Sequence, residues 1–159
     1  MNKWVTEVDG KKPTYKLLWK GSRDGFAVAT FHARCDGLKP TLTIVHSNDG
    51  YVFGGYTSLP WNYVSGTYAQ DLTAFIYSIT QKYKCSEQKN SSSICCNGGY
   101  GPIFGNGHNL YIYDNSNANN SSYSNVSSYT YISPTGASYL TGSHNFTVKE
   151  IEVYLVTKQ

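Results

Sequence analysis

The chain has 159 residues, of which 15% are aromatic and only 14% charged, and its net charge at pH 7 is +3. A single domain of this length buries about two thirds of its unfolded surface, so no metal or disulfide is needed for it to fold. The small charge, with no basic run longer than Lys11-Lys12, argues against nucleic-acid binding. No apolar stretch is long enough to predict a membrane span.

The N-terminal half predicts a strand, a helix and a hairpin. YKLLWK, residues 15–20, is a β-prone run that ends at Gly21. We expect a helix to follow, capped by Ser22 or Asp24 and ended by Asp36-Gly37. Residues at spacings of three and four should form one stripe along this helix. The predicted stripe is Phe26, Ala29, Thr30 and Ala33.

The next two runs, TLTIVHS (41–47) and YVFGGYT (51–57), flank Asn48-Asp49-Gly50 and predict a β-hairpin. Gly54-Gly55 lies inside the second run and indicates a bulge or a close approach of another backbone.

The C-terminal half predicts three more strands, at 72–80, 109–114 and 149–156. In the last, Ile151, Val153 and Leu155 alternate with outward residues. Between the strands we expect two long polar loops, 81–108 and 114–128. Short strands with one clear helix favour a mainly β fold with a few helices, a two-sheet antiparallel β-sandwich flanked by short helices.

The cysteines leave the redox compartment open. Cys35 stands alone, whereas Cys85, Cys95 and Cys96 are close in sequence. A short-loop disulfide from Cys85 to either of the other two suits an oxidising compartment, and free thiols suit the cytosol. The adjacent pair does not fit the spacing of a structural zinc site. MNKWVTEVDGKK lacks the apolar run of a signal peptide, so we expect a cytosolic or released protein.

Four blocks in chain order resemble the TLDc domain family. They are SRDGFAVATFHARCDGLKPTLTIVHSNDGYVFGGYTSLPW, GPIFGNGHNLYI, SSYSNVSSYTY and LTGSHNFTVKEIEVY. The resemblance implies residues 1–14 as an N-terminal extension and residues 15–159 as a single TLDc-like domain with the sandwich fold. It also implies a role in resistance to oxidative stress or in binding the vacuolar proton-pumping ATPase, and no known reaction. Asn109 stands where the family motif often has Asp after Gly-His.

Three features suggest catalysis, and each has a simpler interpretation. His32 and Cys35 are neighbours on the predicted helix, as in an activated thiol, but also as on a buried helix face. Glu150 and Glu152 share one face of a strand and could form a carboxylate pair for acid–base catalysis, but alternate outward charges are also what a solvated sheet face commonly carries. The glycine-rich segment GGYGPIFGNGH suggests a nucleotide site, but it lacks the Lys-Ser/Thr of a phosphate loop, and its glycines more simply permit a tight, irregular loop. We therefore expect no enzyme activity, no cofactor and no metal.

A weakly charged surface rich in tyrosine and asparagine favours a neutral polar ligand, because aromatic rings stack on sugars and amides pair with hydroxyls. We expect a lectin-like module that binds a glycan or glycoprotein surface, and an oligomer would raise its avidity. The alternatives are a cytosolic adaptor for a proton-pump ATPase subunit, or tyrosines that only cover a sandwich. The expected ligand contacts are Trp61, Tyr63, Tyr68, His108, Asn109, Asn115, Asn117 and Tyr123.

Overall fold

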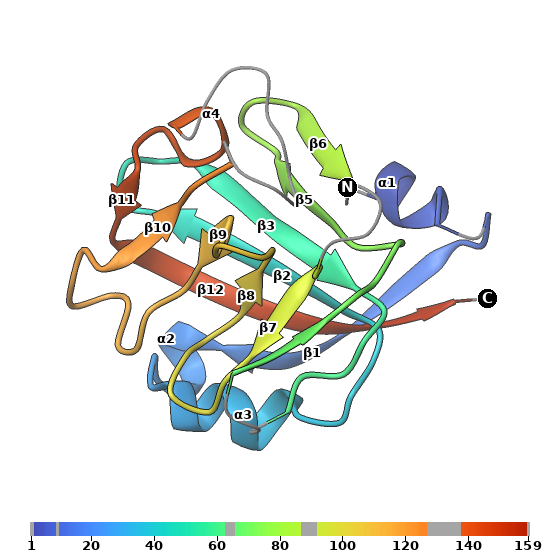
Figure 1. The fold of residues 1–159 in the computed structure, drawn as a ribbon, viewed down its shortest axis with the longest axis horizontal. Coiled ribbons are helices and arrows are strands. Elements are labelled where there is room, and N and C mark those ends of the chain that lie inside the picture. Colours follow the sequence, from blue (N-terminus) through green and yellow to red (C-terminus); the bar gives the residue numbers. More distant parts are fainter. Residues whose placement is uncertain (1, 9, 63–65, 87–91, 127–137, 159) are drawn as a thin grey trace.

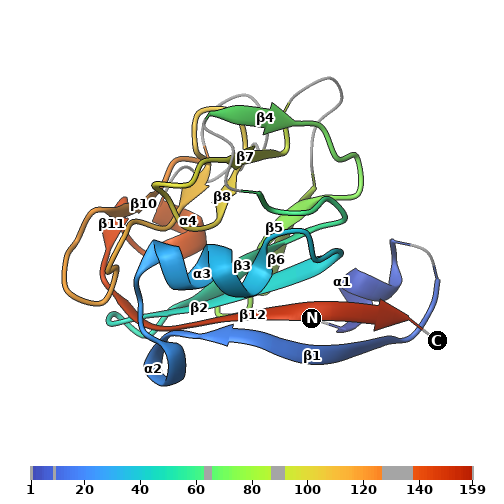
Figure 2. The same cartoon turned by 90° about the horizontal axis from the view of Figure 1, so that it is seen from below.

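The computed structural model describes residues 2–8, 10–62, 66–86, 92–126 and 138–158. Two six-stranded antiparallel sheets face each other, which confirms the predicted β-sandwich (Figures 1 and 2). The first sheet has the order β1 (Pro13–Lys20), β12 (Val148–Lys158), β2 (Thr41–Ser47), β3 (Val52–Thr57), β5 (Phe75–Ser78) and β6 (Tyr83–Ser86). The second has the order β11 (Asn145–Phe146), β10 (Ser122–Ser124), β9 (Leu110–Tyr111), β8 (Ile103–Phe104), β7 (Ile94–Cys96) and β4 (Thr67–Ala69).

The main core fills the space between the sheets, and helix α3 (Val28–Cys35) covers one side of it (Figure 2). Phe31 of α3 contacts the rings of both Trp19 and Trp61, with centroids 5.4 and 5.7 Å apart. Trp61 also meets Phe104 of the second sheet edge to face. These rings join the helix and both sheets in one apolar cluster.

The single helix expected after Gly21 is wrong, because the structure has two. Helix α2 (Gly21–Asp24) ends at Gly25, whose φ of 94° favours glycine, and α3 begins three residues later. The predicted stripe is also wrong: the buried residues of α3 are Val28, Phe31, His32 and Cys35. The helical spacing of three and four is present, but it starts at Val28.

The start of α3 is capped by a residue far along the chain. Its N-cap residue, Ala27, has no side-chain acceptor, and the backbone N–H of Val28 donates to Asp114 Oδ1 at 2.8 Å. Asp24, an expected cap, instead accepts from the backbone N–H of Lys20. The helix start therefore depends on the loop that follows β9.

The predicted hairpin is confirmed by the continuous pairing of β2 with β3. Gly50 closes it with a φ of 83°. Gly54 marks a close backbone approach, since a Cβ there would collide with the carbonyl of Thr43 on β2. At Gly55 the space is filled by the ring of Phe104.

The two predicted long loops are partly wrong. Residues 81–108 contain β6, β7 and β8, and residues 114–128 contain β10. The strand expected at 72–80 is the shorter β5, whose four residues are all buried, and that at 109–114 is the shorter β9. In β12, Ile151 and Val153 are fully buried as predicted, but Leu155 is only half-buried.

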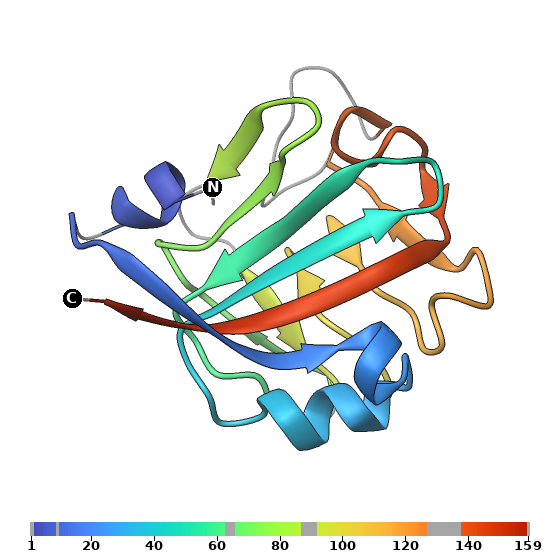
Figure 3. The same cartoon turned by 180° about the vertical axis from the view of Figure 1, so that it is seen from behind.

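The outer face of the first sheet carries a second apolar cluster, which includes residues of helix α1 (Asn2–Thr6). Figure 3 shows α1 near β6, at the edge of this sheet. Val5 of α1 is fully buried there, among Leu42, Tyr56, Phe75 and Tyr77. The remaining helix, α4 (Ser138–Thr141), lies beside β10, β3 and β5. All four cysteines are free thiols and buried.

Candidate functional site

One row of directly paired residues crosses all six strands of the second sheet. Paired residues carry their side chains on the same face. The neighbouring row, which includes Ile94, Phe104 and Leu110, lies in the main core, so this row faces outward. We call it the outer row; its members are Tyr68, Cys95, Ile103, Tyr111, Tyr123 and Asn145.

His108, between β8 and β9, connects the tyrosines of the outer row. Its Nε2 lies 3.3 Å from the Tyr68 hydroxyl and its Nδ1 lies 3.2 Å from the Tyr123 hydroxyl. The imidazole also stacks on Tyr111, with centroids 5.4 Å apart and an interplanar angle of 21°. His108 adopts a left-handed φ of 56°, an uncommon conformation for a residue with a side chain, which places its ring among these three.

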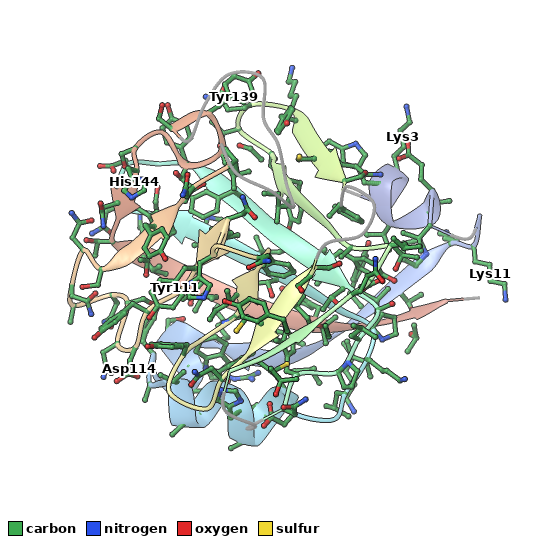
Figure 4. The ribbon with its side chains drawn as sticks, viewed as in Figure 1. Lys3, Lys11, Tyr111, Asp114, Tyr139 and His144 are labelled. Atoms are coloured by element: carbon green, nitrogen blue, oxygen red, sulfur yellow. The ribbon has the colours of Figure 1, made fainter. Side chains whose placement is uncertain are left out.

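Further aromatic rings extend this group. Tyr100 and Tyr113 contact Tyr111 edge to face, and His144 stacks on Tyr123 with centroids 5.5 Å apart. Figure 4 shows Tyr111 and His144 on the same side of the molecule, near β9, β10 and β11. We call the whole set the tyrosine–histidine face: Tyr68, Tyr100, His108, Tyr111, Tyr113, Tyr123 and His144.

Solvent reaches parts of this face, although its centre is closed. Tyr68 and Tyr113 are 42% and 40% exposed, whereas Tyr111 between them is 6% exposed. No pocket opens on the surface of residues 2–8, 10–62, 66–86, 92–126 and 138–158. A ligand would therefore contact the tyrosine–histidine face as an open surface and would not enter a cavity there.

All members of the tyrosine–histidine face are tyrosines or histidines, and outside this set the Asp114 carboxylate contributes, after burial, to raising the pKa of Tyr111. Burial lowers the pKa of His108, which favours the neutral imidazole at neutral pH. Burial also raises the pKa of Tyr68, Tyr111 and Tyr123, so their hydroxyls stay protonated. The rings at its centre therefore offer hydroxyl and imidazole hydrogen bonds without charge.

The structure brings together three of the residues expected to contact a ligand, Tyr68, His108 and Tyr123. The expectation for Trp61 is wrong, because its indole is 1% exposed and its Nε1 donates to Thr41 Oγ1. The expectation for Asn109 is also wrong, since it is fully buried and its amide donates to the Asn125 carbonyl. Both side chains stabilise the interior.

Asn115 and Asn117, two more of the expected contacts, do not join this group. Asn115 and Asn117 are exposed on the loop after β9, and the backbone N–H of Asn115 donates to Phe26, near α3. Tyr63 lies outside the described residues. Whether Asn115 and Asn117 contact a ligand stays a prediction.

Sequence reasoning missed Tyr100, Tyr111, Tyr113 and His144. The alternation of Tyr111 and Tyr113 in LYIYD was an available signal, because residues two apart on a strand share a face. Tyr100 lay in a segment that we expected to be loop, and His144 meets Tyr123 only through the pairing of β10 with β11.

His32 and Cys35 belong to the buried face of α3. Burial raises the pKa of the Cys35 thiol to about 12, so the thiolate of a nucleophile is strongly disfavoured. His32 does not bond that thiol: its Nδ1 lies 2.8 Å from Asp36 Oδ1, and its Nε2 faces the carbonyls of Asn97 and Tyr100. The simpler interpretation of this pair is confirmed.

Glu150 and Glu152 are held by neighbours rather than poised for proton transfer. Lys20 Nζ lies 2.7 Å from Glu152, the Tyr154 hydroxyl donates to Glu152, and the backbone N–H of Ser22 donates to Glu150. Burial acts to raise the pKa of Glu152, but the bonds from Lys20 and Tyr154 outweigh it and the pKa is lowered. A carboxyl in this state is a poor general acid at neutral pH.

A metal centre and a membrane-spanning helix are both absent from the part of the chain that the structure describes. No three histidine, cysteine or acidic side chains there are grouped to hold a metal ion. No helix there has both the length and the apolar character to cross a membrane.

The chain matches the family model of the TLDc domain over residues 4–157. The match begins within α1 and runs through residues 7–14, in the segment that the resemblance implied to be an N-terminal extension. TLDc domains are generally non-catalytic modules. Because the match covers nearly all of the 159 residues, the chain belongs to the TLDc domain family.

Proposed function

We propose that this TLDc domain is a recognition module that binds carbohydrate through the tyrosine–histidine face. The observation that supports the proposal is the outer row with His108, which collects neutral aromatic rings on one side of the second sheet. Sugar rings stack their C–H faces on aromatic rings, and their hydroxyls exchange hydrogen bonds with groups such as the phenol and the neutral imidazole.

The two most exposed rings, Tyr68 and Tyr113, are the expected contact points. Tyr68 lies on the edge strand β4, with its hydroxyl bonded to His108. Tyr113 follows β9 and meets Tyr111 edge to face. Packing against His108 and Tyr111 restricts both rings before a ligand arrives, which lowers the entropy lost on binding.

The test is a glycan array probed with the full chain, followed by calorimetry on any sugar found. Tyr68→Ala and Tyr113→Ala should each weaken binding by about tenfold, the loss expected for one aromatic stacking contact. Tyr68→Phe keeps the ring and should retain most of the affinity. The matched control is Tyr139→Ala on α4, a partly buried tyrosine that Figure 4 shows away from Tyr111.

Two results would contradict the proposal. One is the absence of binding to every sugar on the array by a folded, monodisperse chain. The other is binding that Tyr139→Ala weakens as much as Tyr68→Ala and Tyr113→Ala do.

A second candidate function is an adaptor that docks on the vacuolar proton-pumping ATPase or otherwise supports resistance to oxidative stress. Family membership over residues 4–157 favours it, and the four free, buried thiols are the state expected of a protein kept in a reducing compartment. The measurement is binding of the full chain to the purified ATPase by interferometry. Saturable binding that Tyr68→Ala and Tyr113→Ala do not alter would assign the adaptor role to another surface.

A further inference from the structure

A second surface lies on the opposite side of the sandwich, where α1 packs against part of the outer face of the first sheet. The apolar residues of this face are Leu42, Ile44, Tyr56, Phe75, Tyr77 and Val156. They come from β2, β3, β5 and β12 and are at most 9% exposed with α1 in place. We call this set the α1 seat.

Three side chains of the N-terminal segment hold it on the α1 seat. Val5 is fully buried, and the ring of Trp4 lies on Tyr77 with centroids 5.8 Å apart. Glu7 forms an ion pair of 2.9 Å with Lys84 of β6, whose ammonium also lies 4.8 Å from the Phe75 ring centroid. The anchors are thus an aromatic ring, a β-branched residue and a carboxylate.

The attachment of α1 is made by side chains. Apart from the bonds within α1 itself, the backbone hydrogen bonds that the structure describes for residues 2–8 join Glu7 to Lys3, Val8 to Val5 and Gly10 to Thr6, so they stay within the N-terminal segment. A helix of five residues has no stability of its own in water, so its helical form depends on the seat. An element held by a few side-chain contacts opens more readily than the sheets do.

We propose that the α1 seat is an exchangeable helix-binding site, which α1 occupies within its own chain and which an amphipathic helix of a partner protein can occupy instead. The partner chemistry follows from α1. It needs an aromatic residue to pack on Tyr77, an adjacent β-branched residue to enter the apolar face, and a carboxylate within one turn to pair with Lys84. An interface of this kind depends on a few anchors rather than on its whole area.

The probe is a fluorescent peptide of residues 1–12, MNKWVTEVDGKK, added to the full chain. In wild type the resident α1 competes, so the apparent affinity is reduced by the fraction of open seats. Trp4→Ala in the chain should therefore raise the affinity for the wild-type peptide by about tenfold. The same substitution in the peptide should weaken binding to the Trp4→Ala chain by about tenfold.

The charge pair gives an internal control for folding. In the Trp4→Ala background, Lys84→Glu should weaken peptide binding by about threefold, as expected for an exposed ion pair, and a Glu7→Lys peptide should restore it. A chain that fails to fold would not regain binding through a reversed charge. The proposal is overturned if no chain variant binds the peptide, or if binding is indifferent to residue 4 of the peptide and to the charge swap.

Discussion

Replacing Asp114 by alanine removes the acceptor that caps α3 from a position 86 residues away. Because Ala27 offers no side-chain acceptor, no local group takes over the bond to the Val28 N–H. Loss of a helix cap costs about 0.5–2 kcal/mol, and a charged, partly buried acceptor lies in the upper half of that range. We expect the free energy of unfolding to fall by about 1.5 kcal/mol, with a Tm about 3–6 °C lower.

Urea unfolding followed by tryptophan fluorescence measures this difference. Asp114→Asn keeps an oxygen acceptor and should lose less than about 0.7 kcal/mol. Asn117→Ala, an exposed change in the same loop, is the matched control and should stay within about 0.5 kcal/mol of wild type. If Asp114→Ala lies within about 0.3 kcal/mol of wild type, or if Asn costs as much as Ala, the long-range cap does not stabilise the helix.

Three further predictions concern a thiol, an imidazole and a glycine. Burial raises the pKa of Cys35 to about 12, so a thiol reagent at pH 8 should modify it at least about 100-fold more slowly in the folded chain than in urea; comparable rates would contradict its burial. Because the pKa of His108 is lowered in the fold, the unfolded chain binds the proton more readily, and stability should fall as the pH drops below about 6.5. Chemical denaturation at several pH values should show a smaller fall in the free energy of unfolding for His108→Phe than for wild type. If the two proteins lose stability equally as the pH drops, His108 is not the group responsible. Gly54→Ala should lower the free energy of unfolding by more than about 2 kcal/mol in the same assay, because the new Cβ would collide with the Thr43 carbonyl. Gly99→Ala is the control: its Cβ would make only an ordinary contact, so the loss should stay under about 0.5 kcal/mol.

Local signals predicted the parts of the fold that depend on neighbouring residues. The hairpin was predictable because its turn, Asn48-Asp49-Gly50, specifies the reversal by itself. The break between α2 and α3 was not, because α3 starts where Asp114 meets it and Asp24 bonds backward to Lys20. Strands β7 and β8 have three and two residues, too few for a periodic pattern to indicate them.

The candidate site shows the same division. Composition predicted a weakly charged surface rich in tyrosine and asparagine, and the candidate contacts named on that basis included Tyr68, His108 and Tyr123. It could not distinguish those rings from Trp61, because the exposure of an aromatic side chain depends on which elements pack over it. The meeting of Tyr111 with Tyr123 depends on strand register, which one sequence does not display.

The register of β7 sends two adjacent sulfur atoms into different environments. Cys95 belongs to the outer row, paired with Tyr68, whereas Cys96 packs in the main core with Ile94 and Phe104. Both thiols are buried, so opening of the outer row would expose Cys95, and separation of the two sheets would expose Cys96. Two consecutive residues thus separate two kinds of opening, one at the surface of the second sheet and one between the layers of the sandwich.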